Sequence, residues 1–308
     1  MTAKTQMEGS RFNRISPVAN GLITVLLTFL ALLVILPLAL IVIISFSSSE
    51  SIARNGYTFF PSSWSLGGYE YIFTMGDQIG RSYLITIFYT VAGTAISLAV
   101  ISMFAFVLSQ QQLKARKALT YFLYFTMLFN GGMVANYIIN VRYYGLFDTI
   151  WIFLLPSIVS AYNVFILRTF IQTTIPTSLF ESAKIDGAND LVVFVRIVLP
   201  LFKAGLATVG LFNVVSRWNN WFTGFLYIEE PSLVPLQTML VRMQENVQFL
   251  IENSEVMNGP DGLALRSSMP TKSMQMAVFV ISVIPILFAY PFFQKYFVHG
   301  LTIGSVKG

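Results

Sequence analysis

The chain has 308 residues, of which 55% are hydrophobic, 15% aromatic and only 11% charged, with a net charge of +5. Soluble globular domains carry about 25% charged residues, so this composition excludes a soluble domain and indicates an integral membrane protein. The sequence contains no cysteine and one histidine, His299. This excludes disulfides and thiolate sites, and it argues against a zinc site or a Ser-His-Asp triad. The positive charge fits a basic cytoplasmic face, and we expect no nucleic-acid partner.

Six apolar runs are each long enough to cross a hydrocarbon core, which requires about 20 residues of helix. The first run stays apolar for about 25 residues, beyond the roughly 7–15 of a signal peptide, so we expect a retained anchor helix. The sequence therefore predicts an all-α, polytopic transmembrane helical bundle with six spans at residues 20–46, 82–108, 118–140, 149–171, 203–228 and 273–297.

Lysine and arginine predict the orientation of these spans. With the N-terminus in the cytoplasm and alternating spans, 12 of the 19 lie in inner segments, 6 lie in outer segments, and Arg217 lies inside a span. This bias predicts an N-in, C-in topology. The expected parts are cytoplasmic tails at 1–19 and 299–308, a membrane domain at 20–298, a cytoplasmic loop at about 173–202, and outer loops at about 47–81 and 229–272. The outer loops are long for simple connections, so binding or docking is as good an explanation, and the second contains a possible amphipathic helix, LQTMLVRMQENVQFLI.

The chain lacks the residues that would let it supply its own energy. None of the six runs contains Asp or Glu, which argues against transport coupled to protons or sodium ions. There is no GxxxxGK[ST] motif, so this chain has no P-loop for nucleotide phosphates, and we expect it to bind no cofactor. A membrane-embedded enzyme is disfavoured, because no run holds a catalytic carboxylate, Cys or His. If the protein is an active transporter, another polypeptide must drive it.

One charged residue lies deep in an apolar run, where arginine costs roughly 2.5–3.5 kcal/mol. The i, i+4, i+7, i+11 spacing of its neighbours predicts one polar helical face. Amides and aromatic rings are the partners of sugar hydroxyls and sugar faces, so the stripe is a candidate carbohydrate path. The alternative is an arginine that locks helices together through asparagines and carbonyls. The stripe comprises Asn213, Arg217, Asn220 and Gly224, with Trp218 and Trp221 beside it.

Two other runs contain polar or small residues. Ser157, Ser160 and Asn163 in the fourth run follow an i, i+3, i+6 pattern. Asn163 could extend the path, although such residues more often bind helices to one another. In the third run, Gly131 and Gly132 predict a kink or a close helix contact.

The most specific signal is the charged segment 181–200, ESAKIDGANDLVVFVRIVLP. It resembles the cytoplasmic signature loop of binding-protein-dependent ABC importer permeases, which begins Glu-Ala-Ala, continues to Asp-Gly-Ala and closes with Ile-x-Leu-Pro. The matching triplets are Glu181-Ser182-Ala183 and Asp186-Gly187-Ala188, and the close is Ile197-Val198-Leu199-Pro200. Ser182 replaces the usual alanine.

The resemblance covers nearly the whole chain. FNGGMVANY (129–137), GLFDTIW (145–151), RTFIQTTIP (168–176), RWNNWF (217–222), VPLQ (234–237) and the tail from Tyr290 are similar to the complex-carbohydrate branch, which includes the maltose-type permeases. It implies a type I ABC importer permease in the bacterial cell membrane, a multi-pass half-channel that takes up an oligosaccharide or complex carbohydrate. The implied partners are a second permease, usually in a heterodimer, two copies of an ATPase that uses ATP and Mg, and an extracellular solute-binding protein. The implied ATPase-coupling residues are Glu181, Ser182, Ala183, Asp186, Gly187, Ala188, Asn189 and Pro200.

The residues of this loop fit that role. Ile175-Pro176 predicts an extended entry, and Thr177 or Ser178 can cap a helix. Gly187 and Asn189 allow a break before a second helix with an apolar face of Leu191, Val192, Phe194, Val195 and Val198. The small residues Ala183, Gly187 and Ala188 could then be presented to a groove of the ATPase.

Several alternatives remain open. The substrate could be a polyol, a sugar phosphate such as glycerol phosphate, or an anionic saccharide, with which Arg217 would be compatible. A membrane scaffold that carries no solute is the alternative from another class.

Overall fold

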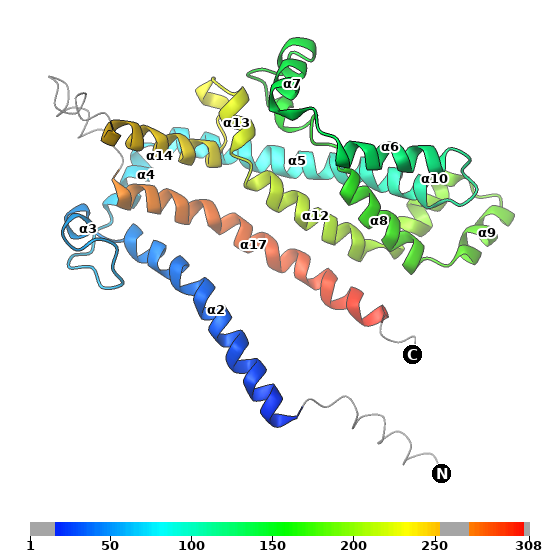
Figure 1. Ribbon diagram of the computed structural model, residues 1–308, viewed down its shortest axis with the longest axis horizontal. Helices are drawn as coiled ribbons and strands as arrows, with labels where there is room; N and C mark the ends of the chain where they lie inside the picture. The colour runs from blue at the N-terminus through cyan, green and yellow to red at the C-terminus, as the bar shows by residue number, and fades with distance from the viewer. Residues whose placement is uncertain (1–15, 253–270, 305–308) are drawn as a thin grey trace. The chain divides into compact units, whose positions relative to one another are not determined.

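The computed structural model describes residues 16–252 and 271–304, and these residues are mostly helical (Figure 1). The one β pairing within these ranges is the isolated antiparallel bridge Ser47–Trp64. Most of the expected tail 1–19, residues 253–270 of the second outer loop, and residues 305–308 lie outside the described residues. The chain forms two compact units, one from Met1–Tyr71 with Pro270–Val280 and one from Ile72–Met269 with Ile281–Gly308.

The first unit is built on the long apolar helix α2. Ser16 caps this helix by accepting a hydrogen bond from Ala19 N at 3.2 Å, and Pro17 occupies its first turn. Apolar side chains are exposed on all sides of α2, as expected for a helix that contacts lipid or another membrane helix. The unit also contains the start of α17, where Ser273 Oγ donates to Ser45 O at 3.3 Å. Its helices are α2 (Pro17–Ser45), α3 (Ser49–Asn55), most of α4 (Gly67–Thr74) and the beginning of α17 (Lys272–Gly304).

The second unit packs α8 and α12 along the long helix α5 (Figure 1). The predicted amphipathic helix is confirmed as α14. Helix α17 continues through His299 to Gly304, beyond the expected end of the last run. The elements are α5 (Gly76–Ser109), α6 (Arg116–Leu128), α7 (Gly132–Ile138), η1 (Ile139–Tyr143), η2 (Ile150–Phe153), α8 (Ala161–Thr174), α9 (Thr177–Ile185), α10 (Asp190–Val193), η3 (Phe194–Val198), α11 (Leu199–Leu201), α12 (Lys203–Trp218), α13 (Phe222–Tyr227), η4 (Pro231–Leu233) and α14 (Leu236–Glu252).

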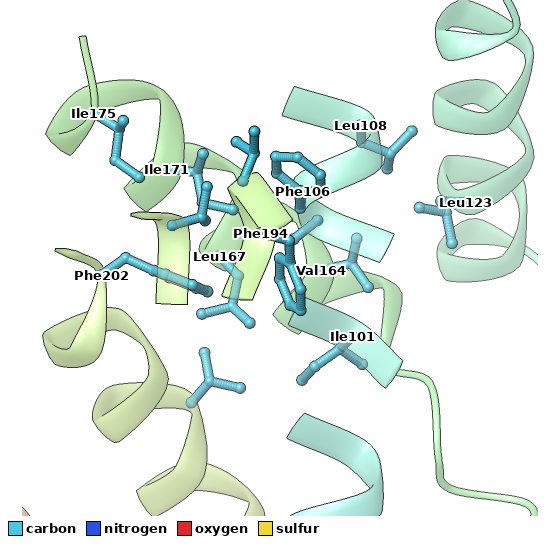
Figure 2. Packing of buried hydrophobic residues seen from close by; sticks show 14 of the residues in the cluster. Ile101, Phe106, Leu108, Leu123, Val164, Leu167, Ile171, Ile175, Phe194 and Phe202 are labelled. Atoms are coloured by element: carbon cyan, nitrogen blue, oxygen red, sulfur yellow. The ribbon is translucent and has the colours of Figure 1, made fainter. Parts of the chain in front are cut away.

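The core of the second unit lies where α5, α8 and α12 meet residues 173–202 (Figure 2). It joins α5, α8 and α12 to residues 173–202, because side chains from all four interdigitate in one cluster. Its members include Ile101, Phe106 and Leu108 of α5, Val164, Leu167 and Ile171 of α8, Phe194, Val198 and Phe202 of residues 173–202, and Val209 of α12.

The structure supports several membrane spans without confirming six. Three helices in the described ranges are long and apolar enough to cross a membrane: α2, α5 and α17 as far as Gln294. The number rises to five if each of two bent pairs forms one span. These pairs are α6 with residues 132–143, bent by 111°, and residues 190–201 with α12, bent by 80°.

Three of the predicted runs are broken rather than continuous. The third bends next to Gly131 and Gly132, where Gly132 has a φ of +80°, so the predicted kink is confirmed. In the fourth, Pro156 lies between the short η2 and the 14-residue α8. The fifth ends as a helix at Trp218.

Candidate functional site

The segment 173–202, here called the coupling segment, is a helix–turn–helix whose turn is made by glycine. Helix α9 ends in a Schellman motif, in which Ala188 N donates to Ala183 O at 3.0 Å and Gly187 N to Lys184 O at 3.1 Å. Gly187 has a φ of +77°, a conformation that favours glycine. The predicted break is therefore confirmed, and hydrogen bonds fix its geometry.

A side-chain cap starts the second helix of the coupling segment. Asn189 Oδ1 accepts a hydrogen bond from Val192 N at 2.8 Å, which confirms the break expected at this residue. The extended entry is confirmed as well, since Pro176 has a ψ of 141°. The expected cap by Thr177 or Ser178 is wrong. Pro176 itself precedes α9 without a side-chain bond, and Ser178 O instead accepts from Ser182 Oγ at 3.1 Å.

The coupling segment turns most of its motif residues outward. Ala188 is half-buried, and the other outward-facing motif residues are exposed: Glu181, Ser182, Asp186, Gly187, Asn189 and Pro200. The side chain of Ala183, which was expected to face a groove of the ATPase, is buried in the core, where its small size lets α9 pack closely. The predicted apolar face is only partly right: Leu191 and Val195 are exposed, while Val193, Phe194 and Val198 are buried.

The side chain of Arg217 is buried and bound to backbone carbonyls. Its Nη1 donates to Phe153 O at 2.7 Å and its Nη2 to Ser157 O at 3.0 Å. Tyr89 OH donates to Arg217 O at 2.9 Å. The guanidinium lies directly against Gly93, where an added Cβ would come within 2.7 Å of Arg217 Cζ. This is the geometry of the helix-locking alternative.

The polar face predicted around Arg217 does not exist as one helical stripe. Helix α12 ends at Trp218, so Asn220 and Gly224 leave the helical spacing on which the prediction depended. Asn220 Oδ1 accepts from Thr223 N at 3.1 Å near the start of α13. Asn213 and Trp218 are buried and donate to Val209 O and Ser282 O, both at 3.0 Å. Trp221 is partly exposed.

The residues of the fourth run also lack a helical stripe. Ser157 precedes α8, and Ser160 caps it by accepting from Asn163 N at 3.4 Å. Ser97 Oγ of α5 donates to Ile158 O at 2.7 Å. The irregular segment Leu154–Ser160 is thus held by α5 and α12 through its carbonyls, as unpaired backbone groups at membrane depth require.

A cavity of about 590 Å³ lies beside this irregular segment. Its lining carries no charged side chain and is rich in amides and tyrosines, and Asn220 is the one lining residue predicted as part of a path. Asn140 Nδ2 donates to Tyr227 OH at 3.2 Å, and the rings of Tyr137 and Tyr227 stack with centroids 5.4 Å apart. The polar and aromatic lining residues are Asn130, Asn136, Asn140, Tyr144, Ser157, Asn220, Phe222, Thr223 and Tyr227.

Three asparagines that line this cavity were assigned no function from the sequence alone. Asn130, Asn136 and Asn140 are amides in an apolar run, where polar side chains are costly and often functional. These asparagines line one cavity because the chain bends at Gly132, and hydropathy does not predict the direction of a bend. Within the described residues, no group of three or more His, Cys, Asp or Glu side chains could hold a metal ion.

Comparison with known proteins identifies the family. Residues 112–303 match the family model of the binding-protein-dependent transport system inner membrane component. The chain belongs to this family. The permease is therefore a multi-pass bacterial inner-membrane protein, and the matched region includes the coupling segment, Arg217 and the amide-lined cavity.

Several characterised proteins are similar over nearly the full length of the permease. The polygalacturonan/rhamnogalacturonan transport system permease protein YtcP of Bacillus subtilis is 39% identical over 92% of this chain and 96% of its own. Protein LplC of the same organism is 36% identical over 98% of both chains. A chain in the crystal structure of a bacterial ABC transporter involved in the import of the acidic polysaccharide alginate aligns with a TM-score of 0.75, at 30% identity, over 91% of this chain and 96% of that chain.

Proposed function

We propose that this chain is one permease subunit of an ABC importer for an oligosaccharide or a larger carbohydrate. The observation that carries the substrate class is the uncharged cavity lined by four asparagines and by tyrosines. Amide groups donate to and accept from sugar hydroxyls, and aromatic rings pack against the apolar faces of sugar rings. The similar proteins named for polygalacturonan/rhamnogalacturonan and alginate transport make a uronic-acid-containing glycan the first candidate.

The proposal includes the finer topology. Six spans with both termini in the cytoplasm fit the distribution of lysine and arginine, with tails at 1–19 and 299–308 and outer loops at about 47–81 and 229–272. The two bent helix pairs then count as spans, and the irregular segment before α8 completes a further one. Irregular backbone is tolerated there because it is bound by protein and borders a cavity.

The partners in this proposal are a second permease, two copies of an ATPase and a solute-binding protein. The exposed residues of the coupling segment would contact the ATPase, and Ala183 would support them from the core. ATP and Mg belong to that partner, since this chain has no P-loop.

The test is ATP hydrolysis by the purified complex in lipid nanodiscs. A solute-binding protein loaded with an oligogalacturonide should stimulate hydrolysis, whereas glycerol phosphate and a polyol should not. Stimulation by glycerol phosphate or a polyol would replace the carbohydrate assignment. An intact complex that responds to no solute would support the scaffold alternative.

A second arm of this experiment tests the cavity. Asn136→Ala removes an amide from the lining and should raise the KM of glycan-stimulated hydrolysis by about tenfold, because one or two hydrogen bonds are lost. Asn219→Ala is the matched control, since Asn219 is exposed and lies outside the lining. Equal KM values for the two variants would show that the cavity is not part of the substrate path.

A further inference from the structure

A second cavity, of about 570 Å³, brings four positively charged side chains together at the start of α6. Lys114, Arg116 and Lys117 line it from the α5–α6 connection and the first turn of α6, and Arg168 lines it from α8. This cavity, here called the basic pocket, lies apart from the amide-lined cavity and shares none of its residues.

The four cations of the basic pocket have no anionic partner in the described part of the chain. No Asp or Glu lines the pocket, and the single salt bridge found among the described residues joins Arg54 to Glu50 elsewhere. The Nε atom of Arg168 is buried and makes no hydrogen bond. Neighbouring like charges and an unpaired buried donor are both costly, so an anion bound in the pocket would stabilise these groups.

The N-terminus of α6 adds to the same positive potential. The helix has no side-chain hydrogen bond at its N-cap and no acidic residue in its first turn. Its dipole therefore favours a negative charge near Lys114, Arg116 and Lys117.

The surface that continues from the basic pocket along α6 is apolar. Tyr121 and Tyr124 line the pocket, and Phe122, Phe125 and Leu128 on the following turns are 63%, 57% and 77% exposed. Helix α6 is the first half of a candidate membrane span. Tyrosines flanked by cations on one side and exposed apolar side chains on the other are typical of the headgroup level of a membrane.

We propose that the basic pocket binds the phosphate headgroup of an anionic phospholipid, with the acyl chains lying along the exposed face of α6. A free phosphate shares the headgroup chemistry, but it would make no use of the adjoining apolar face. The inference depends on membership in the membrane family and is independent of the transported solute. Failure of the glycan experiment would therefore leave it standing.

Lipid retention by the full chain tests this site. The protein is purified in mild detergent from nanodiscs of phosphatidylcholine and phosphatidylglycerol, and bound lipid is counted by mass spectrometry. Wild-type protein should retain phosphatidylglycerol in preference to phosphatidylcholine, and Arg168→Gln should lower that retention by about tenfold, as expected for loss of a charged hydrogen bond. Lys203→Gln, which removes an exposed cation outside the pocket, should retain lipid like the wild type.

A second variant changes cations outside α8, so that its result does not depend on the folding of that helix. Lys114→Gln with Lys117→Gln should also lower retention, and insertion is checked by labelling a single introduced cysteine, which the cysteine-free chain allows. Equal retention of both lipids by wild type, or unchanged retention in both variants, would overturn the proposal. Complete displacement of the lipid by inorganic phosphate would make it a free-phosphate site. If the variants retain the lipid but no longer co-purify with the ATPase subunit, the pocket is a protein-docking surface.

Discussion

At the scale of single residues, the contact between Gly93 and Arg217 joins two helices and an irregular segment. The guanidinium lies against α5 at Gly93, which has no side chain, and reaches the carbonyls of Phe153 and Ser157. Displacing this arginine leaves buried carbonyls and a buried charge unpaired, which costs more free energy than the hydrogen bonds contribute.

Gly93→Ala is therefore expected to destabilise the protein although alanine is the better helix former. The new Cβ would lie 2.7 Å from Arg217 Cζ and displace the guanidinium, a cost of about 1–3 kcal/mol. Gly80→Ala on the same helix is the control, because no atom lies within 4 Å of its added Cβ. Thermal unfolding in detergent should show a lower Tm for Gly93→Ala than for Gly80→Ala. Equal Tm values would show that Arg217 relaxes at no cost.

Gly187 offers a test of the coupling segment at a single exposed residue. No atom lies within 4 Å of an added Cβ, and asparagine tolerates the left-handed conformation, so Gly187→Asn should fold and insert. Gly187→Asp has the same shape with a negative charge, and we expect it to lower uptake and ATPase stimulation by about fivefold or more, an effect of about 1 kcal/mol at a contact surface. Normal uptake with both variants would exclude a close ATPase contact at Gly187.

The sequence predicted the special position of Arg217 and, as one of two alternatives, carbonyl partners, but not which carbonyls they are. A charge in an apolar run stands out from composition alone. Its partners are backbone carbonyls, which any residue possesses, and they become available only because the predicted fourth span is not helical at Leu154–Ser160. The helical spacing of Asn213, Arg217 and Asn220 failed for a similar reason, since the prediction assumed a helix that continues past Trp218.

At the scale of elements, the coupling segment shows how local sequence can determine structure without tertiary information. Its turn depends on one glycine in a left-handed conformation and one asparagine cap, and both effects act within a few residues. The breaks in the predicted spans are different. Hydropathy is an average of composition over a window of residues. A segment that is apolar on both sides of a bend therefore has the same hydropathy as a straight helix.

Asn189→Ala tests the cap of the second helix. It removes the hydrogen bond to Val192 N, at a cost of about 1 kcal/mol, and should loosen the start of α10. Hydrogen exchange of residues 190–193 should accelerate by about fivefold, which is the equivalent of that free energy. Asn189→Ser keeps a capping oxygen and should exchange like the wild type. If alanine exchanges no faster than serine, the cap does not hold the helix.

At the scale of the whole molecule, the second unit has one core that includes the coupling segment. Phe194 and Phe202 pack in the same cluster as Ile101 of α5 and Leu167 of α8 (Figure 2). The coupling segment and helices α5, α8 and α12 are therefore parts of one packed body, and a substitution that destabilises the α5–α8 part of the core should also destabilise the coupling segment.

Leu167→Ala is the corresponding prediction. Leu167 is fully buried, and truncating a buried leucine costs about 2–5 kcal/mol because a cavity remains. The Tm in detergent should fall, and proteolysis within residues 173–202 should accelerate. Leu191→Ala, at a position that is 66% exposed, should change stability by no more than about 0.5 kcal/mol. Faster unfolding of Leu167→Ala without faster cleavage of the coupling segment would show that the two ends of the core unfold separately.

The hydrogen-bonded turn at Gly187 also has a mechanical consequence. The amides of residues 186–188 all donate to α9, so opening this elbow would break several bonds at once. A force that displaces α9 would therefore also displace Val193, Phe194 and Val198, because the turn between them is rigid. The displacement of the membrane helices would then equal the displacement that the partner imposes on α9. A longer or more glycine-rich turn should reduce the displacement that reaches the membrane helices before it lowers the affinity for the partner.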